Sequence, residues 1–438
     1  MIKRLFFVIL SFVLISINLF SVSGLDYKCP VEPRSDSVYL VNMDTGTVVY
    51  EKNADKRNFP ASTTKIMTYI IAIENIQDID HTMVEIKESV IKELADTDSS
   101  VAGLENHIGK KLSVKDLLYC LMVASGNDAS LVLADYVGKG SIESFVKKMN
   151  EKAAELGCKN TNFTNPHGLH NDNHYTTAKD LYIIANYALT LPNFAEISNT
   201  VTYLIKGDDY PLTTTNYMID PSRESDYYYL YCRGIKTGYT DEAGRCLVST
   251  AIADGYAYMC ITLHAPGGSE DSIGSMLDSR EFYRWALTNI EIKYLISKQT
   301  PICEQNINFG KGIESIRLVP QNNVNHLMPK DMEEADITWK AHTMDSIDAP
   351  VKEGDILGTA DVFYKGEKIK EINLVAEQDV ERSPVLFALH MIKSIVFSIW
   401  FLVSMAIIII LCFIYFFITA KYNLDRDYQK KVKKYRNL

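Results

Sequence analysis

The 438-residue sequence has no low-complexity tract, and glycine and proline are not abundant in it. It contains 22 Gly and 13 Pro, whereas 47% of its residues are hydrophobic. These proportions exclude a collagen-like or disordered chain, because enough apolar side chain is present to offset the entropy lost on folding. At usual domain sizes of roughly 100 to 200 residues, the length predicts two or three domains.

The eight cysteines form no Cys-x-x-Cys pair and no regular spacing. The sequence therefore indicates neither a zinc site nor a disulfide framework, and we expect mostly buried thiols. His167, His170 and His174 are close enough in sequence to chelate a metal, but they lack the His-Glu-x-x-His pattern and have turn residues among them. We favour a loop that borders a cleft, and we predict no metal and no cofactor.

The body of the chain is acidic, and basic residues are in excess only at its two ends. The formal net charge is -10, yet residues 421–438 carry seven basic side chains against two acidic ones, and Lys3 and Arg4 stand near the start. A nucleic-acid-binding protein needs a basic stripe on its body. The acidic body therefore excludes nucleic acid as a partner.

Two long apolar runs predict export and a membrane anchor. Residues 1–24 are typical of a secretory signal peptide, with an uncleaved anchor as the alternative. Residues 394–420 contain no charged side chain, and about 20 apolar residues suffice to cross a bilayer. The positive-inside rule places the basic tail, 421–438, in the cytoplasm. We expect a single-pass protein of the cell membrane whose other residues face outward.

Apolar periodicity predicts a mixed helix and sheet (α+β) domain over 25–295. Strand patterns cover 37–51 and 234–263, with turns at 44–46 and 254–255, and helical patterns cover 64–76, 114–124, 129–137, 142–156, 177–189 and 275–287. Short alternating strands then predict a small β-sandwich over 300–383, with a hairpin that turns at Lys365-Gly366. Its last residues, 377–383, suit a linker into the membrane helix.

A cluster of tyrosines lies at Tyr227, Tyr228, Tyr229 and Tyr231. Such rings could stack on a glycan. Strand propensity alone also explains the cluster, and we favour that interpretation.

Three short motifs carry the chemistry of the first domain. In Ser62-Thr63-Thr64-Lys65 the serine and the lysine share one face at the start of a predicted helix. Similar spacings at 89–92 and 144–147 lie in acidic and polar surroundings that favour solvent-exposed helix faces. Ser125-Gly126-Asn127 follows an apolar helix, where a cap is the alternative, and Lys236-Thr237-Gly238 lies in a strand. The order and spacing of all three motifs together indicate a catalytic site.

This combination resembles the penicillin-binding proteins and the class A β-lactamases. More closely, the sequence resembles the low-molecular-mass penicillin-binding proteins, which are serine-type D-alanyl-D-alanine carboxypeptidases. Further matching stretches are 39–46, 60–68, 165–169, 174–178 and 349–358. The resemblance implies a catalytic domain with an antiparallel sheet flanked by helices, and it implies peptidoglycan stem peptides and β-lactam antibiotics as partners.

The resemblance also implies how the reaction starts. Ser62 would form an acyl-enzyme after Lys65 takes its proton, and Ser125 would relay that proton toward the leaving D-alanine. An ordinary lysine has a pKa of about 10.4, so Lys65 must have a lowered pKa to act as a base at pH 7. Burial and the charge of Lys236 can lower it. We predict that Lys65 is neutral and that Lys236 stays charged.

Other motif residues would bind the substrate. Asn127 would orient the peptide, and Lys236 and Thr237 would hold its terminal carboxylate. Gly238 would let the substrate backbone approach the strand closely. The backbone N–H groups of Ser62 and Tyr239 would form the oxyanion hole. Tyr239 stands where many relatives carry His, so we expect retained activity with an altered substrate preference.

Two other functions are weighed against this one. A β-lactamase is disfavoured because the sequence has no Glu-x-x-Leu-Asn element of the class A type, which would activate a deacylating water. A non-catalytic protein that binds cell-wall peptides is disfavoured by the three intact motifs.

Overall fold

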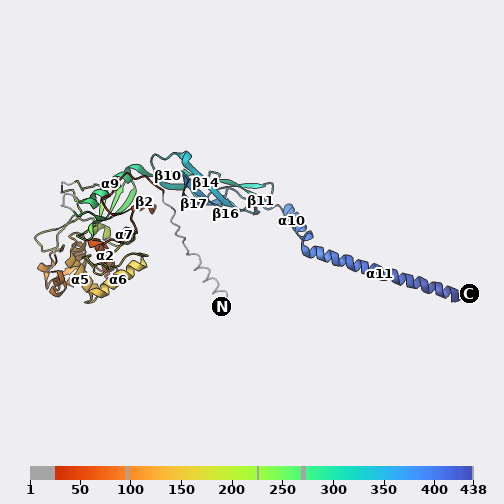
Figure 1. The fold of residues 1–438 in the computed structure, drawn as a ribbon, viewed down its shortest axis with the longest axis horizontal. Helices are drawn as coiled ribbons and strands as arrows, with labels where there is room; N and C mark the ends of the chain where they lie inside the picture. Colours follow the sequence, from red (N-terminus) through yellow and green to blue (C-terminus); the bar gives the residue numbers. More distant parts are fainter. Residues whose placement is uncertain (1–24, 95–96, 98, 224–225, 268–272, 437–438) are drawn as a thin grey trace. The chain divides into compact units, whose positions relative to one another are not determined.

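The computed structural model describes residues 25–94, 97, 99–223, 226–267 and 273–436 (Figure 1). The expected signal peptide, 1–24, lies outside the described residues. The chain divides into two compact units. The first extends to Lys293 and includes His326–Asp336, and the second holds Tyr294–Asn325 and the chain from Ile337 onward.

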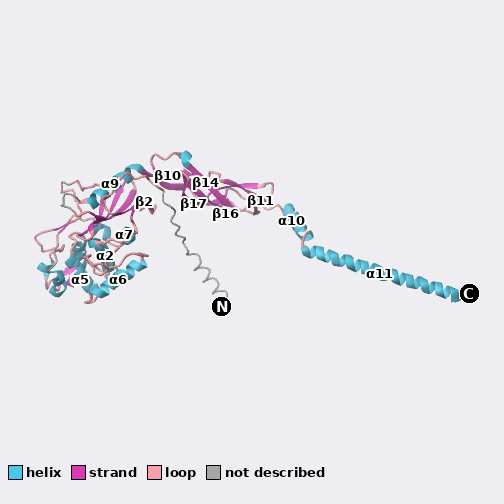
Figure 2. Cartoon of the chain, in the orientation of Figure 1, coloured by secondary structure: helices cyan, strands magenta, loops and turns pink. Residues whose placement is uncertain are grey.

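The first unit contains an antiparallel sheet, whose strands are magenta in Figure 2. Its strand order is β2-β1-β9-β8-β7. Its strands are β1 (Ser37–Asn42), β2 (Thr47–Lys52), β7 (Cys232–Thr240), β8 (Gly244–Ala253) and β9 (Tyr256–Ala265). Asp254 and Gly255 both have positive φ, which suits the tight hairpin turn predicted between β8 and β9. The strand that carries Lys236-Thr237-Gly238 lies at the edge of the sheet.

Six longer helices build the rest of the unit. They are α2 (Lys65–Asn75), α4 (Val114–Met122), α5 (Asn127–Val137), α6 (Ile142–Glu155), α7 (Ala178–Ala188) and α9 (Gly274–Asn289). Two of them, α7 and α9, pack against this sheet. The helices predicted from periodicity are confirmed to within about two residues at each end. Side chains cap three of them, since Ser113, Ser141 and Thr177 each accept a hydrogen bond from a backbone N–H of the first turn.

Short elements connect these helices and strands. They are α3 (Glu88–Ile91), α8 (Phe194–Ser198), the 3-10 turns η1 (Ala61–Thr64), η2 (Lys92–Leu94) and η3 (Leu104–His107), and the strands β3 (Met83–Glu85), β4 (Lys111–Ser113), β5 (Thr202–Tyr203) and β6 (Leu212–Thr213).

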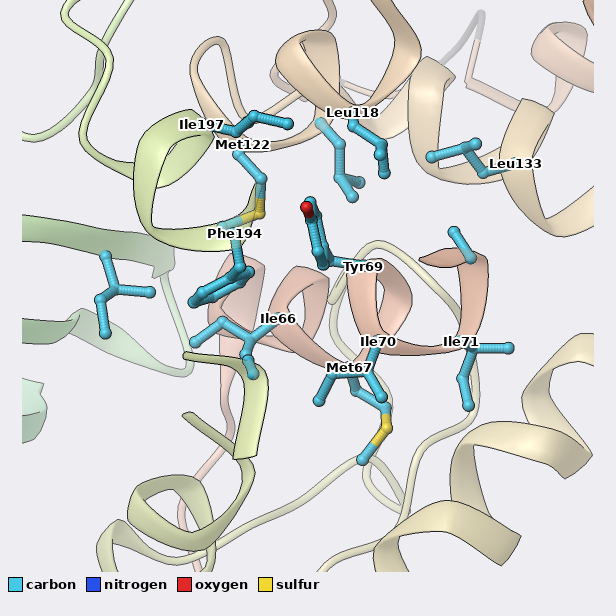
Figure 3. Packing of buried hydrophobic residues seen from close by; sticks show 14 of the residues in the cluster. Ile66, Met67, Tyr69, Ile70, Ile71, Leu118, Met122, Leu133, Phe194 and Ile197 are labelled. Atoms are coloured by element: carbon cyan, nitrogen blue, oxygen red, sulfur yellow. The ribbon is translucent and has the colours of Figure 1, made fainter. Parts of the chain in front are cut away.

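Helix α2 is buried along most of its length (Figure 3). Tyr69 packs edge to face against Phe194 of α8, with ring centroids 4.9 Å apart, and Leu118 of α4 and Leu133 of α5 belong to the same core. Burial of one such side chain stabilises a fold by roughly 1.5 to 3 kcal/mol. Because α2 begins at Lys65, this packing fixes the position of the first motif.

The tyrosine cluster does not lie in a strand, so that interpretation was wrong. Residues 226–231 form turns and loop before β7. The Tyr227 hydroxyl accepts a hydrogen bond from the backbone N–H of Ile273, and Tyr229 stacks on Tyr283. These two rings therefore pack against α9 and the residue that precedes it.

The second unit contains the expected β domain. Its strands have the order β14-β16-β17-β12-β11-β15. Their bounds are β11 (Cys303–Asn308), β12 (Ser315–Pro320), β14 (Ile337–Thr343), β15 (Ile347–Asp348), β16 (Ile356–Tyr364) and β17 (Glu367–Ala376). The hairpin of β16 and β17 turns at Lys365-Gly366, as predicted. Leu318, Ala360 and Leu374 lie in its small apolar core.

The division between the two units falls within two strands that form a separate sheet, β10 (Ile290–Ile296) and β13 (Val324–Pro329). The short turn η4 (Glu334–Asp336) follows β13.

Two helices end the chain, α10 (Pro384–Val396) and α11 (Ile399–Arg436). Ser383 caps α10 by accepting a hydrogen bond from the Leu386 N–H, so the helix begins at the proline that ends the predicted linker. The apolar run predicted as one segment over 394–420 is interrupted at Phe397 and Ser398. Among the helices of the described residues, the one that is long and apolar enough to cross a membrane is Ile399–Lys430.

Candidate active site

Ser62 lies in the tight turn η1, immediately before α2. Ala61 enters this turn with a φ of 47°, and the Thr63 hydroxyl donates a hydrogen bond to the Pro60 carbonyl. Gly168 packs against the turn from a later loop, because a Cβ at 168 would overlap the Ala61 carbonyl. Its φ of +93° also favours glycine. Residue 168 thus helps to hold the serine in place.

Lys65 contacts three oxygen atoms from the interior of the protein. Its Nζ lies 2.9 Å from Ser62 Oγ, 2.6 Å from Asn127 Oδ1 and 2.9 Å from the His167 carbonyl oxygen. A neutral amine has two N–H groups and one lone pair. The two N–H groups can donate to Asn127 and His167, which leaves the lone pair for the Ser62 hydroxyl.

The electrostatic surroundings of Lys65 favour this neutral form. The side chain is fully buried, and burial is the main cause that holds the pKa of Lys65 well below its ordinary value. The charge of Lys236 lowers the pKa further, whereas Asp128 opposes the shift. Lys65 can therefore accept a proton from Ser62 near neutral pH.

Ser125-Gly126-Asn127 connects α4 to α5. Ser125 has a φ of 58° and is 3% exposed. The motif does supply the N-cap residue of α5, Gly126, although neither the Ser125 nor the Asn127 side chain caps the helix. The amide oxygen of Asn127 accepts a hydrogen bond from Lys65. The amide nitrogen of Asn127 is therefore the group that can donate to a substrate carbonyl.

Asp128 supports this region and was missed in the sequence. Its buried carboxylate accepts hydrogen bonds from the backbone N–H groups of Ala102 and Leu104. The segment held in this way includes Ser99 and Ser100, which line the cavity at the site. A carboxylate at the start of an apolar helix was the available signal, because a buried charge needs partners.

Lys236 extends from β7 and is 1% exposed. Its Nζ donates a hydrogen bond to the Thr237 carbonyl at 3.1 Å. Burial lowers the pKa of Lys236 to about 7, so at neutral pH this side chain is only partly charged before an anion binds. A nearby carboxylate would favour the charged form.

Gly238 brings β7 against η1, the turn that carries Ser62. A Cβ at this position would lie 2.9 Å from the Ser62 backbone nitrogen and 3.0 Å from the Pro60 carbonyl oxygen. Tyr239 follows on the strand with a 44% exposed side chain. Its hydroxyl donates to Asp241 at 2.8 Å, and the Arg245 guanidinium lies 4.3 Å from its ring centroid.

A cavity of about 630 Å³ joins these elements. Its lining includes six of the predicted site residues, namely Ser62, Ser125, Asn127, Thr237, Gly238 and Tyr239. Lys65 and Lys236 lie beneath this lining, where Lys65 is within hydrogen-bond distance of Ser62 and Asn127, and Lys236 of Thr237. The other serines with a Ser-x-x-Lys spacing, Ser89 and Ser144, are exposed on other helices.

The histidine rings near the cavity have partners within the protein. His174 Nδ1 accepts from the Thr164 N–H at 3.0 Å, so its Nε2 donates to the Thr64 hydroxyl at 2.8 Å. Burial lowers the pKa of His174 to about 4 and that of His167 to about 3. Within the described residues, no group of three His, Cys, Asp or Glu side chains could hold a metal ion.

The fold and the contact between Ser62 and the buried Lys65 are typical of a serine-type hydrolase. Residues 26–267 match the family described as D-alanyl-D-alanine carboxypeptidase, and residues 291–382 match the C-terminal domain of penicillin-binding protein 5. The chain belongs to this family and is a low-molecular-mass penicillin-binding protein of the serine D-Ala-D-Ala carboxypeptidase type.

Individual relatives agree with this assignment. The chain is 32% identical over 357 residues to D-alanyl-D-alanine carboxypeptidase DacF of Bacillus subtilis, a match that covers 80% of this chain and 87% of the relative. It is also similar to penicillin-binding protein 5 of Haemophilus influenzae, with a TM-score of 0.61, 27% identity and coverage of 81% and 99% of the two chains. DacD of Francisella tularensis gives a TM-score of 0.63 at 27% identity, with coverage of 81% and 95%.

Proposed function

We propose that this carboxypeptidase removes the terminal D-alanine from peptidoglycan stem peptides through an ester on Ser62. The observation that carries the assignment of roles is the 2.9 Å contact between Ser62 Oγ and the buried Nζ of Lys65, whose pKa is lowered. A serine hydroxyl is a weak nucleophile until a base takes its proton. Lys65 is such a base, already in contact with it.

Acylation follows from this pair. Lys65 takes the Ser62 proton while Oγ attacks the carbonyl carbon of the penultimate D-alanine. The oxyanion accepts hydrogen bonds from the N–H groups of Ser62 and Tyr239, each worth roughly 3 to 4 kcal/mol in a comparable enzyme. Ser125 then passes the proton to the nitrogen of the leaving D-alanine, the C–N bond breaks, and water later hydrolyses the ester.

Substrate binding uses the edge position of β7. An extended peptide can add to such an edge as a further strand. In this pose Asn127 contacts the peptide amide, and Thr237 and Lys236 receive the terminal carboxylate. Penicillin would acylate Ser62 by the same route, because its strained amide occupies the position of the peptide bond.

The parts of the chain have separate tasks in this proposal. Residues 25–295 form the catalytic domain and 300–383 the small β domain, both outside the cell, and the apolar helix anchors them with the tail, 421–438, in the cytoplasm. Trypsin added to intact spheroplasts should release both domains and leave the tail protected. Digestion of the tail in sealed cells would refute this orientation.

One assay tests the catalytic assignment. The purified protein is mixed with fluorescent penicillin and, separately, with diacetyl-lysyl-D-Ala-D-Ala. Covalent labelling together with release of D-alanine is expected. Ser62→Ala should lose both reactions by at least about a thousandfold, whereas the matched variant Ser89→Ala should retain them. Rapid turnover of penicillin would favour a β-lactamase, and a folded protein inactive in both assays would favour a binding protein.

A further inference from the structure

A threonine outside the three motifs lies beside Thr237. The hydroxyls of Thr215 and Thr237 form a hydrogen bond with an oxygen separation of 2.5 Å, in which either can be the donor. Both residues line the cavity that contains Ser62. Thr215 belongs to the chain segment between β6 and β7, so nothing in the motif pattern points to it.

The neighbouring Asn216 holds Thr215 in this position. Asn216 is 3% exposed, and its side-chain amide donates to the Gly234 carbonyl of β7 at 2.9 Å. Its amide oxygen accepts from the Met218 N–H, and its own N–H donates to the Thr214 hydroxyl. The segment is thus tied to the strand that carries Thr237.

The two hydroxyls are better placed than the lysines to contact a carboxylate directly. Lys65 and Lys236 are 0% and 1% exposed, and neither contributes to the lining of the cavity. A carboxylate has two oxygens that accept hydrogen bonds. When a carboxylate binds, the hydrogen bond between the two hydroxyls is exchanged for new ones, because each hydroxyl can rotate and donate its proton to one carboxylate oxygen.

We propose that Thr215 is a second binding residue for the terminal carboxylate of the substrate, and that it acts side by side with Thr237. This inference rests on the proposed function, because it takes the carboxylate to lie at Lys236 and Thr237. Lys236 supplies charge from beneath, and the two hydroxyls fix the position of the anion. The site then prefers peptides with a free terminal carboxylate to those with a terminal amide.

The test compares two peptides on full-length protein in detergent. Diacetyl-lysyl-D-Ala-D-Ala and its C-terminal amide are assayed by release of D-alanine or D-alaninamide. Thr215→Val keeps the shape of the side chain and removes the hydroxyl. It should raise KM for the acid about tenfold, change kcat less than about threefold, and leave kcat/KM for the amide within about twofold. Thr215→Ser should restore the wild-type preference.

A purely structural role for Thr215 gives a different pattern. It would lower kcat/KM for the acid and the amide equally, and that result would overturn the inference, as would an unchanged preference in Thr215→Val. If this variant unfolds, Thr215→Ala provides the same comparison. A wild-type protein that cleaves neither peptide would instead refute the proposed function itself, and the inference with it.

Discussion

Gly238 faces the backbone nitrogen of Ser62 so closely that a Cβ there would lie 2.9 Å from that nitrogen. Strand β7 and the turn η1 therefore enclose the position where the proposed oxyanion forms. Nearby atoms that a methyl group would meet belong mainly to the backbone, which cannot rotate away.

Gly238→Ala should accordingly lower the rate of acylation. The added methyl group pushes the Ser62 N–H away from the oxyanion, and loss of one such donor costs roughly a hundredfold to a thousandfold in rate. Penicillin labelling and peptide hydrolysis should both fall by that factor, and the crowded contact should also lower the free energy of unfolding by about 1 to 3 kcal/mol. Gly267→Ala is the control, because its Cβ would approach only the end of the Tyr239 side chain, at 3.3 Å. Equal labelling by both variants would contradict the expectation.

The charge of Lys236 should control substrate affinity through pH. Its pKa is lowered to about 7, so the site loses positive charge as the pH rises above 7. KM for a peptide with a free carboxylate should then rise by up to about tenfold for each pH unit.

Lys236→Arg is the matched variant, because a guanidinium remains charged throughout this range. Its KM should vary little with pH above 7, whatever its absolute value. Steady-state kinetics at several pH values measure this difference. A wild-type KM that is flat between about pH 6 and 9 would speak against it.

Asp128→Asn should lower the stability of the protein and weaken the support of the segment that borders the cavity. The buried carboxylate accepts from the N–H groups of Ala102 and Leu104, and an amide offers one oxygen in place of two. We expect a loss of about 3 kcal/mol in the free energy of unfolding. Activity should fall at least about tenfold, because the segment with Ser99 and Ser100 loses its support.

Asp135→Asn on the same helix provides the control for Asp128. Asp135 pairs with the half-exposed Lys87, and such a surface pair contributes less than about 1 kcal/mol. Chemical denaturation of both variants gives the comparison. Equal free energies of unfolding for the two variants would show that the buried carboxylate of Asp128 contributes no more to stability than the surface carboxylate of Asp135.

His174 should make the protein sensitive to acid. Its pKa is lowered from 6.5 to about 4 in the folded state, so the unfolded chain binds an extra proton between these values. The free energy of unfolding should therefore decrease as the pH falls from 6.5 toward 4, by up to about 1.4 kcal/mol per pH unit. His167 acts in the same direction.

In His174→Asn the slope of stability against pH should be smaller between pH 6.5 and 4. Above pH 7 the curves of the variant and of the wild type should run parallel, which serves as the internal control. Thermal unfolding at a series of pH values tests both statements. Identical slopes below pH 6.5 would exclude the assigned role.

The helices and the motif strand could be predicted because their signals are local. Apolar periodicity gave α2 and α6 almost to the residue, and Asp254-Gly255 marked a turn that needs positive φ. The three motifs each lie within one short segment. Their resemblance to a family then indicated that these segments meet in one site.

Other parts of the site depend on contacts between distant segments. Gly168 matters because it touches Ala61, more than a hundred residues earlier in the chain, and Thr215 matters because Asn216 ties it to β7. No periodicity marks such residues. The lowered pKa of Lys236 likewise comes from burial, which a sequence pattern on an edge strand does not reveal.

The end of the chain shows a third kind of difference. Residues on both sides of Phe397 and Ser398 are equally apolar, so composition predicts one continuous segment. The helix nevertheless stops at Val396 and starts again at Ile399. Hydropathy detects the apolar character of a segment but not an interruption of its backbone hydrogen bonds.

The two buried lysines beneath the cavity come from separate elements, Lys65 from helix α2 and Lys236 from strand β7. The pKa of Lys65 thus depends on the distance between helix α2 and strand β7. A wider gap would admit water and weaken the repulsion between the two amines, and each change would return a proton to Lys65. The packing of the two elements therefore also sets the pKa of the proposed base.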